Sequence, residues 1–128
     1  MSDFSAAMLD RPTAASAASG ERPIDLVHLA RMTLGERSLE REVLQLFDRQ
    51  AMLLLGRMQA APAAAMPSLA HTLKGSARAI GAGGVARAAE TLEFMDCVDD
   101  AALRCALAAL GAATDEARAY IAELLRIH

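Results

Sequence analysis

The residue types best suited to chemistry gather in one short stretch, which also contains the only lysine of the chain. His71, Lys74, Gly75 and Arg78 are separated by three, one and three residues. On a helix with 100° per residue, these four positions fall within about 100° of one another. We therefore expect a single helix face that carries an accessible imidazole, two cations and one position without a side chain.

An imidazole in this setting suits phosphoryl chemistry. An exposed imidazole is a nucleophile when neutral, which is its main form near pH 7, and neighbouring cations favour that form. The charges of Lys74 and Arg78 suit the oxygens of an incoming phosphoryl group. Gly75 leaves room for a bulky partner. The alternative is an ordinary solvated helix face, with Gly75 packed against a neighbouring helix.

The parts of a self-contained active site are missing from the sequence. It contains no P-loop and no nucleotide-binding glycine motif of a kinase. It also lacks the Glu-x-x-His pairs that di-iron bundles use, since position 68 is a serine. We therefore expect no kinase activity of its own, and neither a metal nor another cofactor bound by this chain.

The helix that presents His71 is framed by Pro67 and Gly81. An apolar stripe on its other side predicts the surface that packs into a core. This stripe consists of Leu69, Leu73, Ala77 and Ile80.

Composition favours an all-α fold for the chain of 128 residues. Alanine, the best helix former, occurs 30 times, whereas aromatic residues make up 3% and tryptophan is absent. Short connections between amphipathic segments indicate an up-down four-helix bundle with a short additional N-terminal helix over residues 23–128. Residues 1–22 are predicted to be a flexible arm. The expected helix boundaries are Asp25, Gly35, Ser38, a break at Gly81, Gly83 and Gly84, and Asp99 or Asp100.

Charge and hydropathy exclude several classes of protein. A net charge of −3 argues against a nucleic-acid binder. No apolar run approaches the ~18 residues that span a bilayer, and the N-terminus lacks the basic start of an export signal. Cys97 and Cys105 match no metal or redox motif and are predicted to be small buried residues. We therefore expect a cytoplasmic protein.

The stretch HTLKGSARAIGAGGVARAAETLE, from His71 to Glu93, resembles the signature of histidine-containing phosphotransfer (HPt) domains. It covers about a fifth of the chain. Val85 stands where the family more often has leucine, and Ala89 where it often has cysteine. The matching positions are His71, Leu73, Lys74, Gly75, Ser76, Ala77, Gly81, Ala82, Leu92 and Glu93.

This resemblance implies a phosphorelay intermediate of two-component signalling. By analogy His71 is the phosphoacceptor, through Nε2, and Lys74 hydrogen-bonds the phosphoryl oxygens. Gly75 leaves room for the receiver domain of a response regulator, whose Asp exchanges the phosphoryl group and which binds its own Mg²⁺. A sensor histidine kinase or hybrid kinase is the other implied partner. Arg78 is not part of this signature and is proposed as a site residue only because it shares the helix face of His71.

A docking surface is expected on the helix that begins at Ser38, because its apolar residues exceed the width of one core stripe. Neighbouring helices covering this surface, or a homodimer interface, are the alternatives, with a monomer favoured. The expected stripe consists of Leu39, Val43, Leu46, Phe47, Leu53, Leu54 and Met58. The expected docking residues are Leu44, Ala51, Met52 and Leu55, together with Gly75 and Arg78.

Two further interpretations remain open at this point. The chain is alternatively a helical-bundle adaptor that binds a receiver or kinase without carrying phosphate. It is alternatively a phosphotransfer domain excised from a larger hybrid kinase. Acid-labile phosphate on the protein distinguishes a carrier from an adaptor.

Overall fold

The computed structural model describes residues 22–96 and 99–127. Within these ranges all regular structure is helical, as the composition predicts. Arg22 is the only described residue of the expected N-terminal arm, and Cys97 also lies outside the described residues. The elements are α2 (Leu26–Thr33), α3 (Arg37–Ala60), the 3₁₀ turn η1 (Ala63–Ala65), α4 (Met66–Ile80), α5 (Gly83–Phe94) and α6 (Asp100–Ile127).

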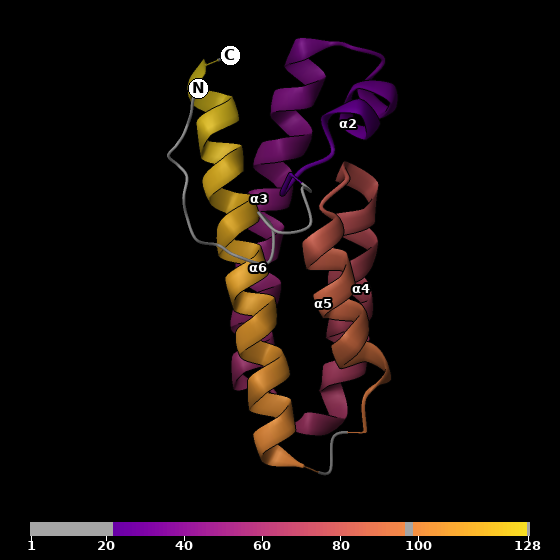
Figure 1. Cartoon of the computed structure of the whole chain (residues 1–128), viewed down its shortest axis with the longest axis vertical. Helices are drawn as coiled ribbons and strands as arrows, with labels where there is room; N and C mark the ends of the chain where they lie inside the picture. The colour runs from indigo at the N-terminus through magenta and orange to yellow at the C-terminus, as the bar shows by residue number, and fades with distance from the viewer. Residues whose placement is uncertain (1–21, 97–98, 128) are drawn as a thin grey trace.

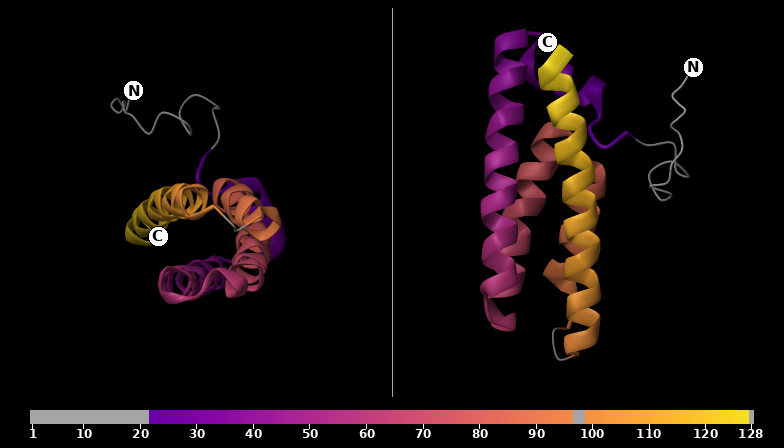
Figure 2. Two further views of the ribbon diagram at one scale, coloured as in Figure 1. Left: turned by 90° about the horizontal axis from the view of Figure 1, so that it is seen from below. Right: turned by 90° about the vertical axis from the view of Figure 1, so that its left-hand side faces the viewer.

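The four longer helices lie side by side and alternate in direction along the chain (Figure 1). Seen end-on, each lies beside the next in chain order, from α3 to α6 (Figure 2). Helix α6 packs mainly on α5 and α3 and makes little contact with α4. Helix α4 therefore has α5 on one side, α3 on the other and an outward face between them.

Helix α2 is fixed to the end of α4 by backbone contacts. Asp25 caps α2 as predicted, since its carboxylate accepts hydrogen bonds from the N–H groups of Val27 and His28 at 3.1 and 3.2 Å. The Asp25 N–H donates to the carbonyl of Gly81 at 2.9 Å. Gly81 has φ 82°, and a Cβ there would lie 3.1 Å from Asp25. The turn that ends α4 therefore requires glycine twice over, for its left-handed backbone and for space.

The sequence predicts the start of α6 correctly and the end of α2 to within one residue. Asp99 caps α6, accepting from the N–H groups of Ala101 and Ala102, as expected. Helix α2 ends one residue before the predicted stop, because Leu34 rather than Gly35 takes the left-handed position after the helix, with φ 55°. Gly35 follows with φ 73°.

The core lies between the four longer helices, and the predicted stripe of α4 is correct at Leu73, Ala77 and Ile80. The stripe of α3 is correct at Phe47, Leu54 and Met58 but is rotated from the expected one. Leu46 and Leu53 are 53% and 55% exposed, although they were expected inside. Cys105 is also exposed rather than buried. The buried residues of α3 are Leu44, Phe47, Ala51, Leu54 and Met58.

This rotation has a simple cause. Leu44, Phe47, Ala51 and Leu54 follow the i, i+3, i+7, i+10 spacing of one helix face. Additional leucines on the neighbouring faces give the same helix a second apolar stripe. The sequence alone is then compatible with two rotations of α3 about its axis, and the packing of α4 and α6 selects one of them.

Candidate functional site

The imidazole of His71 stands on the outward face of α4, as the helical spacing predicts, with 68% of its side chain exposed. Its Nδ1 lies 2.6 Å from Oε2 of Glu93, on the last turn of α5. Among the described residues, no group hydrogen-bonds Nε2. One ring nitrogen is thus held by the protein, while the other faces solvent.

The contact with Glu93 decides which nitrogen carries the proton of the neutral ring. An ionised carboxylate only accepts hydrogen bonds, so Nδ1 must be the donor. The lone pair of the neutral imidazole then lies on Nε2, the exposed nitrogen. Glu93 therefore fixes both the orientation of the ring and the position of its nucleophilic atom.

Lys74 differs from expectation, because its side chain is only 9% exposed rather than outward-facing. It lies along α5, where Nζ is 2.5 Å from Oε1 of Glu93 and 3.8 Å from Oε2 of Glu90. The ring of Phe94 lies 5.0 Å from the same ammonium group, within the range of a cation–π contact. Lys74 is thereby held one helical turn from His71 with its charge toward the shared carboxylate.

Glu93 is the residue that joins the site, since its two oxygens contact His71 and Lys74. The contact with the Lys74 ammonium is the largest influence on the Glu93 carboxyl and holds its pKa below the ordinary 4.5. Desolvation opposes this by raising the pKa, and the hydrogen bond from His71 adds to the lowering. The ionised form that the hydrogen bond to Nδ1 requires is thus favoured.

Gly75 lies in open space on the exposed side of α4. A Cβ built on it would meet nothing within 4 Å, so it does not pack against a neighbouring helix. Glycine inside a helix costs about 1 kcal/mol relative to alanine. The packing of this chain gives no reason for that cost, and the position leaves open space one turn from His71.

Arg78 is exposed, as predicted, and its guanidinium donates to Oε2 of Glu90 at 3.2 Å. The same carboxylate oxygen lies near Lys74. The site therefore extends along the α4–α5 edge as a row in which nitrogen-bearing side chains and carboxylates alternate. In order, the row is His71, Glu93, Lys74, Glu90 and Arg78.

The expected docking patch on α3 requires correction. Leu44 and Ala51 are 2% and 0% exposed and belong to the core, so no partner reaches them. Asp48, bonded to Arg118, marks the α6 side of α3. Met52 and Leu55 follow Asp48 by four and seven residues and share that side, away from His71.

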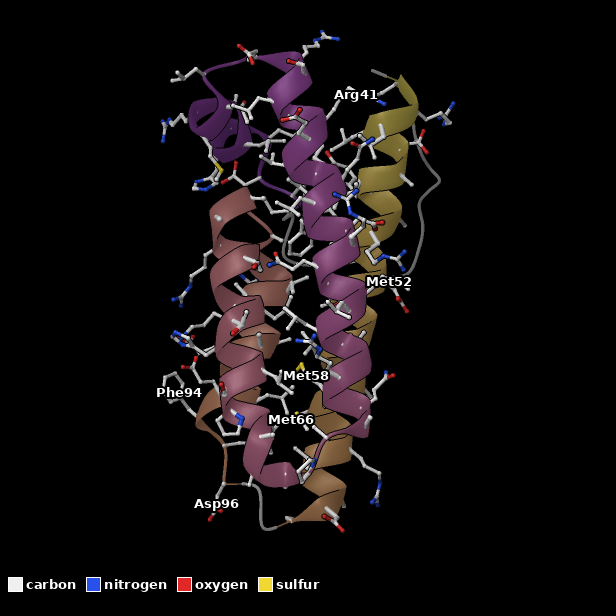
Figure 3. The ribbon with its side chains drawn as sticks, turned by 180° about the vertical axis from the view of Figure 1, so that it is seen from behind. Arg41, Met52, Met58, Met66, Phe94 and Asp96 are labelled. Carbon is white, nitrogen blue, oxygen red and sulfur yellow. The ribbon has the colours of Figure 1, made fainter. Side chains whose placement is uncertain are left out.

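Other residues of α3 lie next to the His71 face. Gln50 accepts a hydrogen bond from Ser76 of α4 at 2.9 Å, which marks the α4 side of α3. Leu46 and Leu53 lie four residues before and three after Gln50, so they share this side. Figure 3 shows Met52 at the α6 side of α3, and Phe94 at the opposite edge of the bundle. The exposed apolar side chains that border the outward face of α4 are thus Leu46 and Leu53.

Two absences hold for the described residues. Within residues 22–96 and 99–127, no three His, Cys, Asp or Glu side chains are grouped to hold a metal ion. In the same part of the chain, no helix combines the length and the apolar character needed to cross a membrane.

Comparison with known proteins decides the family. The Hpt domain model matches residues 38–126, which is most of the chain and includes the whole His71 site. The chain belongs to the Hpt domain family. Separate searches of curated proteins and of solved structures found no match. Membership in the Hpt family gives the chain a phosphotransfer role in phosphorelays, in which these domains interact with receiver domains and kinases.

Glu93 is the functional residue that reasoning from spacing missed. It lies 22 residues after His71 and on another helix, so no helical wheel places it beside the imidazole. The signal was present, because Glu93 is the last position of the stretch that resembles the family signature. The resemblance includes Glu93 as a matching position and implies no role for it.

Proposed function

We propose that this Hpt domain carries a phosphoryl group on Nε2 of His71 and exchanges it with the Asp of a response-regulator receiver domain. The observation that carries the proposal is the pairing of an exposed, unbonded Nε2 with an Nδ1 held by Glu93 at 2.6 Å. A carrier needs a positioned nucleophile that an outside donor can reach. His71 is held in position by Glu93 and is exposed, which supports both requirements.

The transfer step balances without a further reactant. The Nε2 lone pair attacks the phosphorus of the receiver acyl phosphate, forming a P–N bond as the P–O bond to the Asp carboxylate breaks. The electron pair of that bond leaves with the carboxylate. The proton stays on Nδ1, and the positive charge that the ring gains faces the carboxylate of Glu93. The return step reverses these changes.

Lys74 stabilises the charge of the transferring group. Its ammonium is one turn from His71 and retains donors beyond those directed at Glu93. Phosphoryl oxygens are strong acceptors for such a donor. Mg²⁺ in this account belongs to the receiver domain, and a sensor or hybrid kinase of a two-component system supplies the phosphate in the cytoplasm.

The partner docks over the outward face of α4. Gly75 provides close approach, and Leu46 and Leu53 of α3 provide apolar surface next to it. Phe94 borders the same face on the α5 side and is 70% exposed. This surface replaces the patch of Leu44, Met52 and Leu55 inferred from the sequence.

The test is phosphate uptake from a phosphorylated receiver domain, chosen by profiling the receivers of the source organism. The wild-type chain should gain acid-labile, base-stable phosphate, and His71→Gln should gain none while keeping its helicity. Lys74→Ala should slow uptake by ~10²-fold. Binding of the receiver without any label on the wild-type chain would instead identify an adaptor.

A further inference from the structure

We propose that Glu90 and Arg78 set the position of the phosphotransfer equilibrium, by opposing effects on the phosphorylated state of His71. The inference rests on the proposed function and deepens it. It concerns how strongly the domain holds its phosphoryl group, and therefore the direction in which phosphate flows.

Glu90 is close enough to act on the phosphoryl group. Its Oε2 lies 3.8 Å from Nζ of Lys74. A phosphoryl oxygen bonded to that ammonium at about 2.8 Å then lies within about 7 Å of Glu90. This is less than the Debye length of about 8 Å at physiological ionic strength. The carboxylate and the phosphoryl group therefore repel one another with incomplete screening.

Phosphorylation makes the site more negative, because the phosphoryl group adds about two negative charges whereas the ring gains at most one positive charge. Glu90 raises the free energy of this state, both directly and by occupying part of the Lys74 charge. Arg78 does the opposite, since its guanidinium lies 3.2 Å from Glu90 and neutralises it. Neither residue touches the reacting atoms, so both act as tuning residues through Lys74 and Glu90.

These two side chains are free to have such a role, because the fold does not depend on them. Glu90 and Arg78 are 44% and 57% exposed, so their ion pair contributes little to stability. Glu90 instead lies between two cations of α4, Lys74 and Arg78. Its effect on the phosphorylated state has a definite sign for each residue.

The experiment measures the equilibrium distribution of ³²P between the domain and a receiver that exchanges phosphate with it, approached from both directions. Glu90→Gln should shift the equilibrium constant about three- to tenfold toward the phosphorylated domain. Arg78→Gln should shift it about two- to fivefold toward the phosphorylated receiver. The double variant should lie within about twofold of wild type. Raising the salt concentration should shrink both shifts.

The matched controls are Glu123→Gln and Arg126→Gln, an exposed ion pair on α6 remote from His71. A purely structural or docking role for Glu90 changes forward and reverse rates together and leaves the equilibrium constant unchanged. Unchanged constants for both site variants, or shifts of the same sign, overturn the inference. A wild-type chain that takes up no label overturns the proposed function itself, so the two failures are distinct.

Discussion

At the scale of single residues, one carboxylate organises the site. Glu93 holds Nδ1 of His71 through one oxygen and the ammonium of Lys74 through the other. Helical spacing in the sequence predicts only cations around the imidazole. The structure adds the anion that determines which ring nitrogen is nucleophilic, and this changes what mutation of the site should do.

Glu93→Gln should slow phosphate uptake by about tenfold, since a hydrogen bond to a charged group becomes one to a neutral group while the nucleophile remains. An amide still accepts a hydrogen bond from Nδ1 but no longer balances the charge of the ring or of Lys74. Time courses of phosphate uptake at a saturating concentration of phosphorylated receiver measure this effect. An unchanged rate would remove Glu93 from the mechanism.

The same carboxyl gives a pH dependence of stability. Because its pKa in the folded state is lowered from 4.5, ionised Glu93 stabilises the fold above that pH. This contribution is lost as the pH falls through the lowered pKa. The difference in urea midpoint between wild type and Glu93→Gln should therefore be largest near neutral pH and shrink below pH 4.5. A difference that grows on acidification contradicts the ion pair.

Gly75→Ala should separate stability from function. Its Cβ meets nothing within 4 Å, so we expect the fold to gain about 0.5–1 kcal/mol. The same methyl group would stand on the proposed docking face, so receiver affinity and transfer rate should fall. Gly111→Ala on α6 is the matched control, with the same open space and an expected gain in stability only. Equal transfer by both variants would show that Gly75 is not part of the docking face.

At the scale of elements, the phase of α3 is what sequence reasoning could not settle. The face of α4 was predictable, because one apolar stripe and one polar stripe fix its rotation. Helix α3 carries leucines on several sides, and only hydrogen bonds such as Ser76–Gln50 and Arg118–Asp48 show which side meets which neighbour. The docking patch moves from Met52 to Leu53 for this reason.

This correction predicts different effects for two neighbouring leucine-sized side chains. Leu53→Glu should weaken receiver binding by about tenfold, because a leucine buried on docking contributes about 1–2 kcal/mol. Met52→Glu should leave binding unchanged, although Met52 is almost equally exposed, 52% against 55%. Titration of the receiver with each variant measures the affinities. A larger loss of receiver affinity for Met52→Glu than for Leu53→Glu would instead support the docking patch expected from the sequence.

At the scale of the whole molecule, composition and helix spacing were enough for the helical fold and for the exposed face of His71. They were not enough for contacts between α4 and α5, on which the burial of Lys74 and the role of Glu93 depend. These contacts join residues 19 to 22 positions apart on two packed helices. Local periodicity carries no information about such a pairing.

The packed helices of the bundle therefore fix the position of one reactive atom on its surface. Helix α5 supplies the carboxylates, α3 supplies apolar surface, and α4 presents the imidazole between them. The proposed mechanism depends on attachment of the phosphoryl group to the exposed nitrogen of His71, because Glu93 occupies the other nitrogen.

The most direct measurement is the site of attachment by ³¹P and ¹⁵N correlation NMR on the domain phosphorylated by its receiver. We expect phosphorus to couple to Nε2 of His71, with Nδ1 still protonated and in contact with Glu93. Phosphorus on Nδ1, or on any residue other than His71, would contradict it.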